Sequence, residues 1–339
     1  MKKILEQVVS SDLNKNLLSI EKLVSGGNNQ VFRIICDDAK LLAKIYFYNG
    51  DKSQNRRLHR EFDALSFLWQ KGIRQIPEPL HIDIENQIGF YNFIDGEKIK
   101  QNDIQNDDLL QAAGFLGRLS DVSQLSEAEQ IGTASDACLN LDDYWQSIET
   151  RYQQINKAIA GKKFYHHVID FFKKEFVPFL EQARSCYEKS LSEINQPHLK
   201  PILSPSDFGF HNALKLRNGE IIFIDFEYFG WDDPAKLIAD FFHHPAMSLS
   251  EKQKQFFLNS FLQITKAEET LIQQIRLVYF AVGLKWCLLM INVCLPDVMA
   301  RKRFARSDLQ DEIVIEEQLE KSKTKLRQLQ EANDHPLFF

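Results

Sequence analysis

The polar residues with the clearest chemical potential lie in one short segment, residues 204–234. Asp207 lies in a glycine-containing loop, Asn212 follows it, and Asp225 ends the apolar run Ile-Ile-Phe-Ile. A loop carboxylate can accept a proton from a hydroxyl group, while an amide and a second carboxylate offer the oxygen ligands that Mg²⁺ prefers. The Asn-Gly pair at 218–219 predicts a β-hairpin, which would bring Asn212 and Asp225 together. Each residue alone could simply close a turn or end a strand, but the three in this order are typical of phosphoryl transfer.

This segment resembles the aminoglycoside phosphotransferase and choline kinase family, whose members are distant relatives of the protein kinases. The family pattern His-Gly-Asp-x-x-x-x-Asn, followed by Ile-Asp-Trp-Glu, is matched by Asp207, Asn212 and the Ile-Asp-Phe-Glu run at 224–227. The sequence departs from the pattern at residues 205–206, where Pro-Ser replaces His-Gly. That histidine is mainly structural in the family, so the departure weakens the resemblance without removing a reactive group.

The resemblance implies a role for each matching residue. Asp207 would orient or deprotonate the hydroxyl of the phosphate acceptor as the catalytic base, and Asn212 and Asp225 would bind the Mg²⁺ ions that bridge the phosphates of ATP or GTP. Glu227 would support a metal, contact the substrate, or accept a structural hydrogen bond. His211 could contact the substrate, although packing on a neighbouring phenylalanine of the loop is the favoured interpretation.

A turn in the first fifty residues could bind phosphate through its backbone. Its residues, which separate two strand-like segments, are Gly26, Gly27, Asn28 and Asn29. A glycine-rich hairpin allows backbone N–H groups to approach phosphate oxygens. The turn resembles the family's Gly-Gly-x-Asn-x-Val-Tyr stretch, but any β-turn could look similar when it is taken alone.

Lys44 lies within an apolar strand-like run, where burial of an unpaired ammonium would be costly. The amphipathic helix that follows carries Glu61. By resemblance to the kinases, Glu61 would pair with Lys44 and leave the lysine to contact the α- and β-phosphates of the nucleotide. A strand-edge lysine in solvent is the alternative, but the order of the glycine turn, Lys44 and Glu61 favours the phosphate site.

Two further segments are interpreted through the same resemblance. Residues 90–96 would form the hinge between two lobes, and the backbone of Asn92, Phe93 and Ile94 would bind the adenine edge. Beyond the metal-binding residues, Asp233 precedes a proline and is a natural helix N-cap, so its role is predicted to be structural.

The helix that Asp233 begins carries Asp240, His243 and His244. Asp240 and His243 are three residues apart and could share one face, which would let Asp240 face the substrate. Metal binding by the two histidines is disfavoured because adjacent side chains on a helix rarely point the same way. Ordinary capping of the helix end is the favoured interpretation of the histidines.

The hydrophobic pattern predicts the elements that position these residues. Three strand-like runs between residues 17 and 47 predict an antiparallel meander, and apolar residues at three- and four-residue steps predict a helix over 53–71. Two more strands are predicted at 80–84 and 88–94. Beyond them long helices are predicted around 106–120, 142–160, 164–192, 250–264, 267–295 and 310–332. Short strands return at 198–203, 213–217 and 221–226.

This order of elements gives an α+β fold class, a small antiparallel β-rich lobe followed by a large, mainly helical lobe. The resemblance identifies the arrangement as the protein-kinase-like bilobal fold. Residues 1–95 would be the N-terminal nucleotide-binding lobe, and residues 96–339 would be the C-terminal catalytic and substrate-binding lobe.

The composition limits the partners. The 339 residues include 41 Lys or Arg and 47 Asp or Glu, so the net charge is −6 and no general basic field exists to hold nucleic acid. We therefore expect no nucleic-acid partner and a cationic or neutral acceptor. The five cysteines are widely spaced without a Cys-x-x-Cys pair, which indicates reduced thiols rather than a zinc site. The N-terminal residues lack a signal-peptide pattern, so a cytoplasmic location is expected.

One segment, residues 277–295, is nearly long and apolar enough to cross a bilayer. Lys285 lies at mid-span, where a charge is costly in lipid. The segment is therefore predicted to be a buried core helix with Lys285 facing a cleft or a carboxylate, and no membrane partner is expected. The charged C-terminal helix from about residue 308 could lie on another subunit, but a solvated face is favoured, and the sequence predicts no oligomeric state.

The leading hypothesis is a Mg²⁺-dependent kinase that moves the γ-phosphate of ATP or GTP to a hydroxyl of a sugar, amino sugar or amino alcohol. Only about eight residues separate Asp225 from the next predicted helix, which is too short for the platform on which protein kinases hold a protein substrate. The alternative is a pseudokinase, a nucleotide-binding or scaffolding module without turnover. The Pro-Ser departure favours that alternative, while the retention of Lys44, Glu61, Asp207, Asn212 and Asp225 opposes it.

Overall fold

The computed structural model describes residues 1–23, 29–48, 56–193, 200–267, 269–305 and 309–334. The chain divides into two compact units, each built from separate stretches of sequence. Unit 1 comprises residues 1–99, 212–229 and 300–309, and unit 2 comprises residues 100–211, 230–299 and 310–339. Unit 1 thus adds to the first hundred residues the hairpin that carries Asn212 and Asp225, whereas the sequence assigns that hairpin to the helical lobe.

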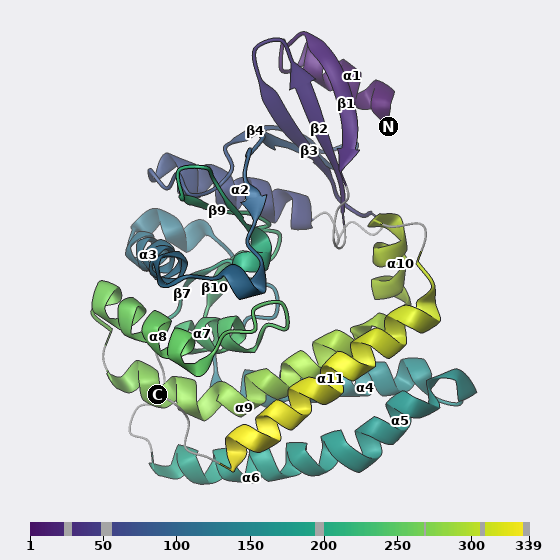
Figure 1. Cartoon of the computed structure of the whole chain (residues 1–339), viewed down its shortest axis with the longest axis vertical. Coiled ribbons are helices and arrows are strands. Elements are labelled where there is room, and N and C mark those ends of the chain that lie inside the picture. The colour runs from purple at the N-terminus through teal and green to yellow at the C-terminus, as the bar shows by residue number, and fades with distance from the viewer. Residues whose placement is uncertain (24–28, 49–55, 194–199, 268, 306–308, 335–339) are drawn as a thin grey trace. The chain divides into compact units, whose positions relative to one another are not determined.

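Unit 1 is built on a five-stranded antiparallel sheet (Figure 1). The strands lie in the order β1-β2-β3-β5-β4, and one helix, α2, follows the third strand, as the sequence predicts. Their bounds are β1 (Leu17–Leu23), β2 (Gln30–Cys36), β3 (Lys40–Ile45), α2 (Arg56–Gln70), β4 (Pro79–Asp83) and β5 (Ile88–Asn92). The register pairs Lys44 of β3 with Val31 of β2 and Gly89 of β5, so Lys44 lies on a strand that has partners on both sides.

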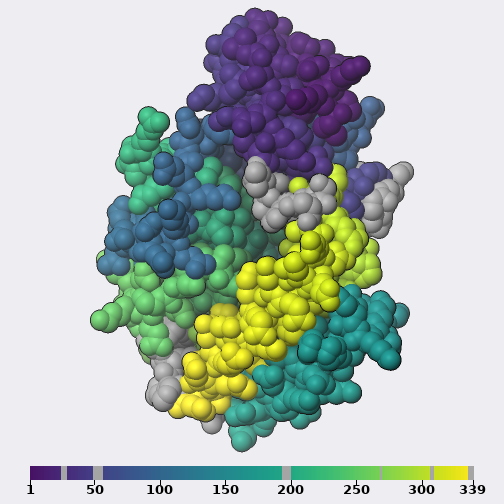
Figure 2. Space-filling view, turned by 45° about the vertical axis from the view of Figure 1, so that its right-hand side comes forward, coloured from purple at the N-terminus to yellow at the C-terminus, as the bar shows by residue number. Residues whose placement is uncertain are grey.

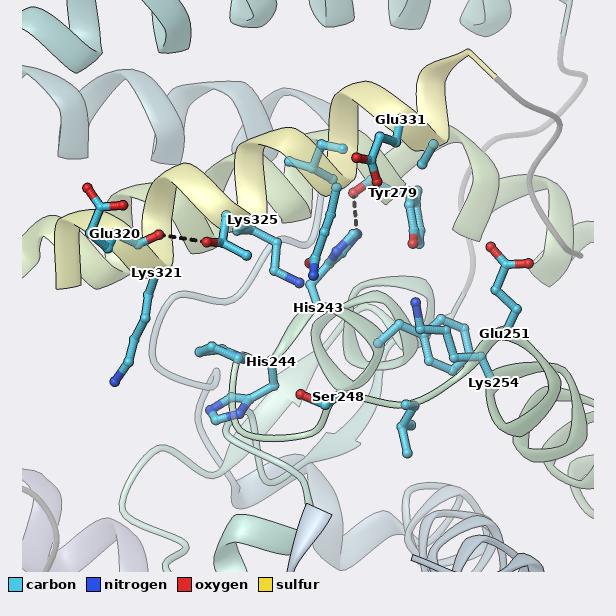
Figure 3. A pocket seen from close by; sticks show the side chains of 17 residues that line it. His243, His244, Ser248, Glu251, Lys254, Tyr279, Glu320, Lys321, Lys325 and Glu331 are labelled. Carbon is cyan, nitrogen blue, oxygen red and sulfur yellow. Dashed lines mark hydrogen bonds between the residues drawn. The ribbon is translucent and has the colours of Figure 1, made fainter. Parts of the chain in front are cut away.

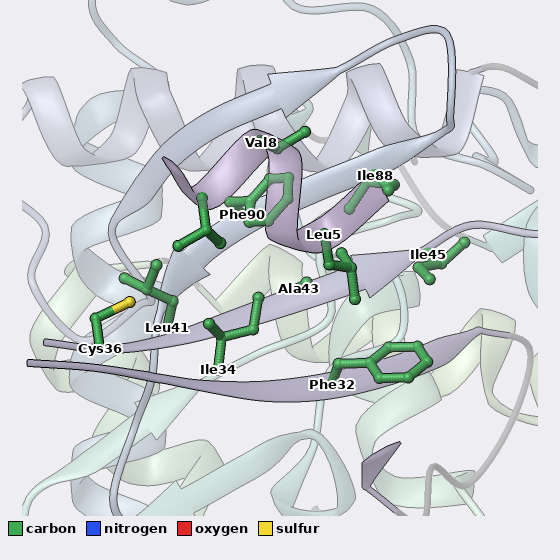
Figure 4. Packing of buried hydrophobic residues seen from close by; sticks show 11 residues of the cluster. Leu5, Val8, Phe32, Ile34, Cys36, Leu41, Ala43, Ile45, Ile88 and Phe90 are labelled. Atoms are coloured by element: carbon green, nitrogen blue, oxygen red, sulfur yellow. The ribbon is translucent and has the colours of Figure 1, made fainter. Parts of the chain in front are cut away.

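A helix that the sequence does not predict, α1 (Lys2–Ser11), covers one face of this sheet (Figure 4). Its buried residues are Leu5, Val8 and Val9, whose i, i+3, i+4 spacing forms one apolar helix face. They pack with strand residues including Ile34 and Phe90 in a single hydrophobic cluster. This cluster holds the strand that carries Lys44 in place.

A small three-stranded sheet, also in unit 1, holds the predicted hairpin. Its order is β6-β8-β9, with bounds β6 (Glu97–Lys98), β8 (Ala213–Lys215) and β9 (Ile221–Phe223). Gly219 has a φ of +88°, a conformation that glycine adopts without strain, so the Asn-Gly turn forms where the sequence predicts it. At the open end of the hairpin the Ile224 N–H donates to the Asn212 carbonyl at 2.9 Å. The hairpin therefore brings the backbone of Asn212 next to that of Asp225.

Unit 2 is mainly helical (Figure 1), and most of its helices lie close to the ranges that the sequence predicts, but α10 is not predicted and the helix predicted at 164–192 is divided into α5 and α6. The helices are α3 (Asn106–Val122), α4 (Leu141–Ile159), α5 (His166–Phe171), α6 (Val177–Glu193), α7 (Pro234–His243), α8 (Glu251–Thr265), α9 (Glu269–Ile291), α10 (Pro296–Ala305, which continues into unit 1) and α11 (Asp311–Asn333). A π-helical turn, Phe172–Phe176, joins α5 to α6. Two short strands, β7 (Ile202–Ser204) and β10 (Gly230–Asp232), pair with each other. Single 3₁₀ turns occur at Gln101–Asp103, Ser126–Gln130, Lys163–Tyr165, Phe210–Asn212 and Asn292–Cys294.

Helix α9 lies at the centre of unit 2, against α4, α6, α7 and α11. Together with the turn after it, this helix (Glu269–Cys294) is long and apolar enough to cross a membrane, and 83% of its most apolar window is buried within the protein. This burial agrees with the prediction that residues 277–295 form a buried core helix. Lys285 faces a carboxylate as predicted, because its Nζ lies 2.9 Å from Asp240 Oδ1.

The C-terminal helix α11 packs along α9 through an apolar stripe. The stripe includes Ile315, Leu319, Leu326 and Leu329, all of them buried. The rest of the helix forms a band on the surface of unit 2 (Figure 2). The stripe is thus covered within the chain, which agrees with the predicted solvated face on the other side.

Candidate active site

The functional residues of unit 1 meet at Lys44, which is 7% exposed. Its Nζ lies 2.6 Å from Glu61 Oε2 of α2 and 2.6 Å from Asp225 Oδ1, just after β9. A third carboxylate, that of Glu227, lies 4.0 Å away. The ion pair between Lys44 and Glu61 forms as predicted, and the structure adds two carboxylates to it.

The charges of Lys44 and its three carboxylate neighbours do not balance. Burial alone would lower the pKa of the Lys44 ammonium, but the Asp225, Glu61 and Glu227 carboxylates raise it well above its usual value. Burial raises the pKa of Asp225 to about 7, and Glu227 and Glu61 add to this rise while Lys44 opposes it. Lys44 therefore stays charged, and Asp225 is the least compensated of the three carboxylates.

Glu61 is held in place by three donors. Besides Lys44, the Tyr46 hydroxyl donates to Oε2 at 2.6 Å and the Phe226 N–H donates to Oε1 at 3.2 Å. Tyr46 is two residues beyond Lys44, and side chains two apart point to the same side of an extended chain. That spacing is the signal from which Tyr46 could have been predicted.

Glu227 is buried and connects several parts of unit 1. It accepts a hydrogen bond from Asn29 Nδ2 at 2.8 Å, and Arg57 Nη1 lies 3.4 Å from its Oε1. Burial alone would raise the pKa of Glu227, but Lys44 and Arg57 hold it below its usual value. The sequence did not single out Arg57, although it lies four residues before Glu61 on the same helix face. Of the predicted phosphate turn, Asn29 takes part in this network, and residues 26–28 lie outside the described residues.

The carboxylates of Glu61, Asp225 and Glu227 are arranged so that a cation could bind among them. One oxygen from each lies within 4.8 Å of the others. Hard oxygen donors of this kind suit Mg²⁺, and Asp225 is the most accessible of the three, with 36% of its side chain exposed. Asp225 also has a φ of +68°, an uncommon backbone conformation for a residue other than glycine that is often found at functional sites. The donor set fits the metal that the sequence predicts beside Asp225.

The predicted hinge lies at the end of β5. The Asn92 N–H donates to the Glu78 carbonyl at 3.0 Å, and the Phe93 N–H donates to the Lys40 carbonyl at 3.1 Å. Both N–H groups are thus used within the protein. Of the three hinge residues predicted to bind adenine, Ile94 is the remaining candidate for a backbone donor.

Asp207 lies in unit 2 and is held by two stacked histidines. His211 Nε2 lies 3.2 Å and His244 Nε2 lies 3.4 Å from Asp207 Oδ1. The two rings stack at 3.7 Å between centroids with 5° between their planes. The prediction that His211 packs on a loop phenylalanine is therefore wrong, because the imidazole of His244, which comes from the end of α7 and is distant in sequence, takes that position.

The hydrogen bonds assign the protons on His244. Its Nδ1 accepts from the Ala246 N–H at 3.1 Å, so its Nε2 carries the proton and donates to Asp207. Burial lowers the pKa of His244, which keeps the ring neutral. Asp207, His211 and His244 are close enough to surround a metal ion, but Nε2 would have to lose its proton while Nδ1 has none. This arrangement favours hydrogen-bond donors to Asp207 over metal ligands.

Burial alone would raise the pKa of Asp207, but the hydrogen bonds from His211 and His244 hold it well below its usual value. The carboxylate is therefore ionised across the physiological pH range. The residue before it, Ser206, has a φ of +67° and stands where the family pattern has glycine. Its hydroxyl donates to the Ser135 carbonyl at 3.1 Å. Serine thus adopts the backbone conformation that suits glycine, with a hydrogen bond that helps to hold it.

A second buried ion network, in unit 2, connects the start of α7 to α9. Lys236 Nζ lies 2.6 Å from Asp232 Oδ2 and 2.9 Å from Asp240 Oδ2. Asp240 also binds Lys285 and accepts from Trp286 Nε1 at 2.8 Å. Burial alone would raise the pKa of Asp240, but the two lysines hold it below its usual value. These contacts bury Asp240 inside unit 2 and occupy both of its carboxylate oxygens.

Two other residues of α7, Asp233 at its start and His243 at its end, have structural contacts. Asp233 caps α7 as predicted, because its Oδ1 accepts from the Ala235 N–H at 2.7 Å. His243 is buried, and its Nε2 lies 2.9 Å from the Tyr279 carbonyl. His243 and His244 therefore point to different partners, as expected for adjacent residues on a helix.

The structure thus forms two groups of candidate residues, each within one unit. Unit 1 brings together Asn29, Lys44, Glu61, Asp225 and Glu227, with the Asn212 backbone beside them. Unit 2 brings together Asp207 and His211 and adds His244. The sequence does not indicate the His244 contact, because it depends on how the end of α7 packs against the loop.

Comparison with known proteins supports the fold that the sequence predicts. Residues 19–263 match the phosphotransferase enzyme family (APH), while no curated protein matches the sequence. Similar solved structures include a choline kinase from Streptococcus pneumoniae, with a TM-score of 0.61 and 16% identity over 97% of this chain and 99% of that chain. An ethanolamine kinase from Plasmodium vivax has a TM-score of 0.62 and 17% identity over 98% and 84% of the two chains. A spectinomycin phosphotransferase solved with ADP and spectinomycin has a TM-score of 0.62 and 16% identity over 96% and 98%. The predicted protein-kinase-like α+β fold is confirmed.

Proposed function

Because the chain belongs to the phosphotransferase enzyme family, we propose that it transfers the γ-phosphate of ATP or GTP to a hydroxyl group of a small molecule, with Mg²⁺ as cofactor. The observation that carries this proposal is the position of Lys44, 2.6 Å from both Glu61 and Asp225. A buried lysine that a helix glutamate orients toward a candidate metal-binding aspartate is the arrangement that kinases use to hold nucleotide phosphates.

In unit 1 the proposed role of Lys44 is to bind the α- and β-phosphates. Glu61, held by Tyr46 and the Phe226 N–H, keeps the ammonium in position. Asp225 and Asn212 would hold Mg²⁺, and Glu227 would keep Asn29 of the phosphate turn close to them. When bound, Mg²⁺ would neutralise negative charge that develops on the phosphate oxygens.

In unit 2 the proposed role of Asp207 is to accept a hydrogen bond from the acceptor hydroxyl and to aim its oxygen at the γ-phosphate. The donors His211 and His244 fix the carboxylate by binding one of its oxygens. A carboxylate with so low a pKa removes the proton only as the new O–P bond forms, since it is a weak base toward a free alcohol. Its main contribution is therefore orientation, with proton acceptance late in the reaction.

The test is acceptor-dependent release of ADP or GDP from a panel of sugars, amino sugars and amino alcohols. Asp207→Asn should lower kcat by about 10²- to 10⁴-fold, the range expected for loss of a general base. The matched control is Asp121→Asn, an exposed aspartate on α3, which should leave kcat unchanged. If Asp207→Asn keeps the wild-type rate, the catalytic assignment is wrong.

The pseudokinase alternative makes a different prediction for the wild type. A scaffold that only binds nucleotide would be stabilised by Mg·ATP in a thermal melt but would release no ADP with any acceptor. A kinase would show both. The two readouts therefore separate nucleotide binding from turnover.

A further inference from the structure

A cavity of about 720 Å³ lies within unit 2, beside the loop that ends α7. It is enclosed by α8, α9, α11 and the segment after α7 (Figure 3). His244 forms part of its wall, and the same imidazole donates to Asp207. A molecule in this cavity would therefore lie one side chain away from the proposed catalytic carboxylate.

Two lysines from different helices face this cavity. Lys254 comes from α8 and Lys325 from α11, and both are directed toward the same space, with His243 between them (Figure 3). Among the residues that the structure describes, none forms an ion pair or hydrogen bond with the Lys325 ammonium. Burial, together with the positive charge of Lys254, lowers the pKa of Lys325 to about 8. Burial also lowers the pKa of His243, with Lys325 and Lys254 adding to the shift, so this ring is neutral.

Three carboxylates also line the cavity, and all three are exposed. Glu320 is bound to Lys323, a neighbour on α11, at 2.7 Å and points away from the lysines (Figure 3). Glu251 lies in the first turn of α8, and its charge only partly offsets the effect of burial on the pKa of Lys254, which remains below its usual value. Glu331 lies near the exposed end of α11. None of these three carboxylates forms an ion pair with Lys325, so within the described lining the Lys325 ammonium faces the cavity without a bound carboxylate.

Asp240, which lies two residues before the first lining residue, does not supply an anion to the cavity. It is bound by Lys236, Lys285 and Trp286 and is buried. A cationic acceptor would need an uncompensated carboxylate or an aromatic cage to replace its hydration. Beside its three exposed carboxylates, the described lining offers the ammonium groups of Lys254 and Lys325 and the imidazole of His244, which contacts Asp207.

We propose that this cavity holds the phosphate acceptor and that the acceptor carries an anionic group, a carboxylate or a phosphate, which Lys325 and Lys254 bind. The inference rests on the proposed function and narrows its substrate class to hydroxy acids and phosphorylated alcohols. It revises the expectation of a cationic or neutral acceptor, which rested on the net charge of −6 for the whole chain. The local field in the cavity, rather than the sum over the chain, decides which ligand is stable there.

The experiment compares three classes of acceptor with the full-length protein and Mg·ATP. The anionic class is D-glycerate, D-gluconate and glycerol 3-phosphate, the cationic class is choline and ethanolamine, and the neutral class is glycerol and D-ribose. We expect kcat/KM to be at least about tenfold higher for a member of the anionic class, since a charge-assisted hydrogen bond supplies that much discrimination. The carboxylate and phosphate members separate the two sources of negative charge.

Lys325→Ala is the critical variant, and Lys323→Ala is its matched control. Lys323 lies on the same helix two residues away but outside the cavity lining. Lys325→Ala should raise KM for the anionic acceptor at least about tenfold and leave kcat and the KM for ATP within about twofold. Lys323→Ala should change neither. Preference for choline or ethanolamine, or an equal effect of the two variants, would overturn the proposal.

A binding measurement keeps this inference separate from the proposed function. Calorimetric titration with inorganic phosphate, D-glycerate or glycerol 3-phosphate does not depend on turnover. If no acceptor is phosphorylated but one of these anions binds the wild type at least about tenfold more tightly than Lys325→Ala, the cavity assignment holds and the kinase assignment fails. If Mg·ATP binds and none of these anions does, the cavity assignment fails.

Discussion

Two buried ion networks in this protein look alike but differ in charge balance. In unit 1, Lys44 and Arg57 face three carboxylates, those of Glu61, Asp225 and Glu227. In unit 2, the carboxylates of Asp232 and Asp240 are bound by Lys236 and Lys285. The first network has an excess of negative charge, and the second is balanced.

The difference teaches how to separate a binding site from a structural ion network. Burial raises the pKa of Asp225 to about 7, because Lys44 cannot compensate all its carboxylate neighbours. The two lysines around Asp240 overcome the same burial effect and lower its pKa. A network that leaves one accessible carboxylate poorly compensated is ready for a cation, whereas a balanced and buried one has no place for a ligand.

The largest expected effect is on the balanced network. Lys236→Met should cost about 3–5 kcal/mol of folding free energy, because it leaves Asp232 and part of Asp240 buried without their counter-charge. Urea unfolding followed by circular dichroism measures this loss. Lys174→Met, which breaks an exposed ion pair with Asp170, is the control and should cost less than about 1 kcal/mol. Similar losses for the two variants would show that the balanced network is not structural.

The next effect concerns Lys325, with which none of the carboxylates among the described residues forms an ion pair. Its ammonium form is present below a pKa of about 8 and is lost above it. KM for an anionic acceptor should therefore rise up to about tenfold between pH 7 and pH 9. Lys254, whose pKa burial also lowers, would add to the rise.

The other groups that face Lys325 should not reverse this trend. The pKa of His243 lies well below its usual value, and that of Tyr279 is raised to about 12 by burial, so both are neutral across the range. The exposed carboxylates are those of Glu251, Glu320 and Glu331, and the remaining cavity groups are Lys321 and His244. Lys325→Arg should flatten the profile, because arginine keeps its charge. An unchanged slope in Lys325→Arg would mean that another group titrates.

The smallest expected effect is on the unbalanced network. Asp225→Asn should change the free energy of unfolding by less than about 1 kcal/mol without Mg²⁺, because it removes repulsion from Glu61 and Glu227 together with the attraction to Lys44. The same variant should lose the stabilisation that Mg·ATP gives the wild type in a thermal melt. Asp240→Asn in the buried network provides the contrast and should destabilise strongly. A large loss in Asp225→Asn would make Asp225 a structural residue.

The sequence predicts the unit 1 site well, because its parts are linked by strong local signals. A lysine in an apolar strand needs an anion, and the resemblance to the kinases points to Glu61 as its partner. An Asn-Gly hairpin fixes which residues lie side by side, so the pairing of Asn212 with Asp225 could be expected. The meander of β1, β2 and β3 was predicted from its strand-like runs, whereas the place of β5 beside β3 was not predicted. The strands β8 and β9 are short but flank the Asn-Gly turn, whereas β6 and β10 have no such signal beside them and were not predicted.

What the sequence did not reveal depends on contacts between distant segments. One of these contacts had a local signal: Lys236 lies four residues after Asp232 and four residues before Asp240, a spacing that could have indicated their pairing. The approach of His244 to Asp207 and the facing positions of Lys254 and Lys325 have no such local signal. They arise from the packing of α7, α8, α9 and α11, which spacing along one chain does not determine.

The most direct test of the central claim is calorimetric titration of Mg·ATP into the wild type and into Lys44→Met. If the unbalanced network is a nucleotide-phosphate site, the wild type should bind Mg·ATP, and Lys44→Met should bind it at least about tenfold more weakly, the loss expected for a charge-assisted contact. The same titration without Mg²⁺ should show weaker binding to the wild type. Equal affinity of the two proteins for Mg·ATP would contradict the account, because Lys44 would then have no part in holding the phosphates.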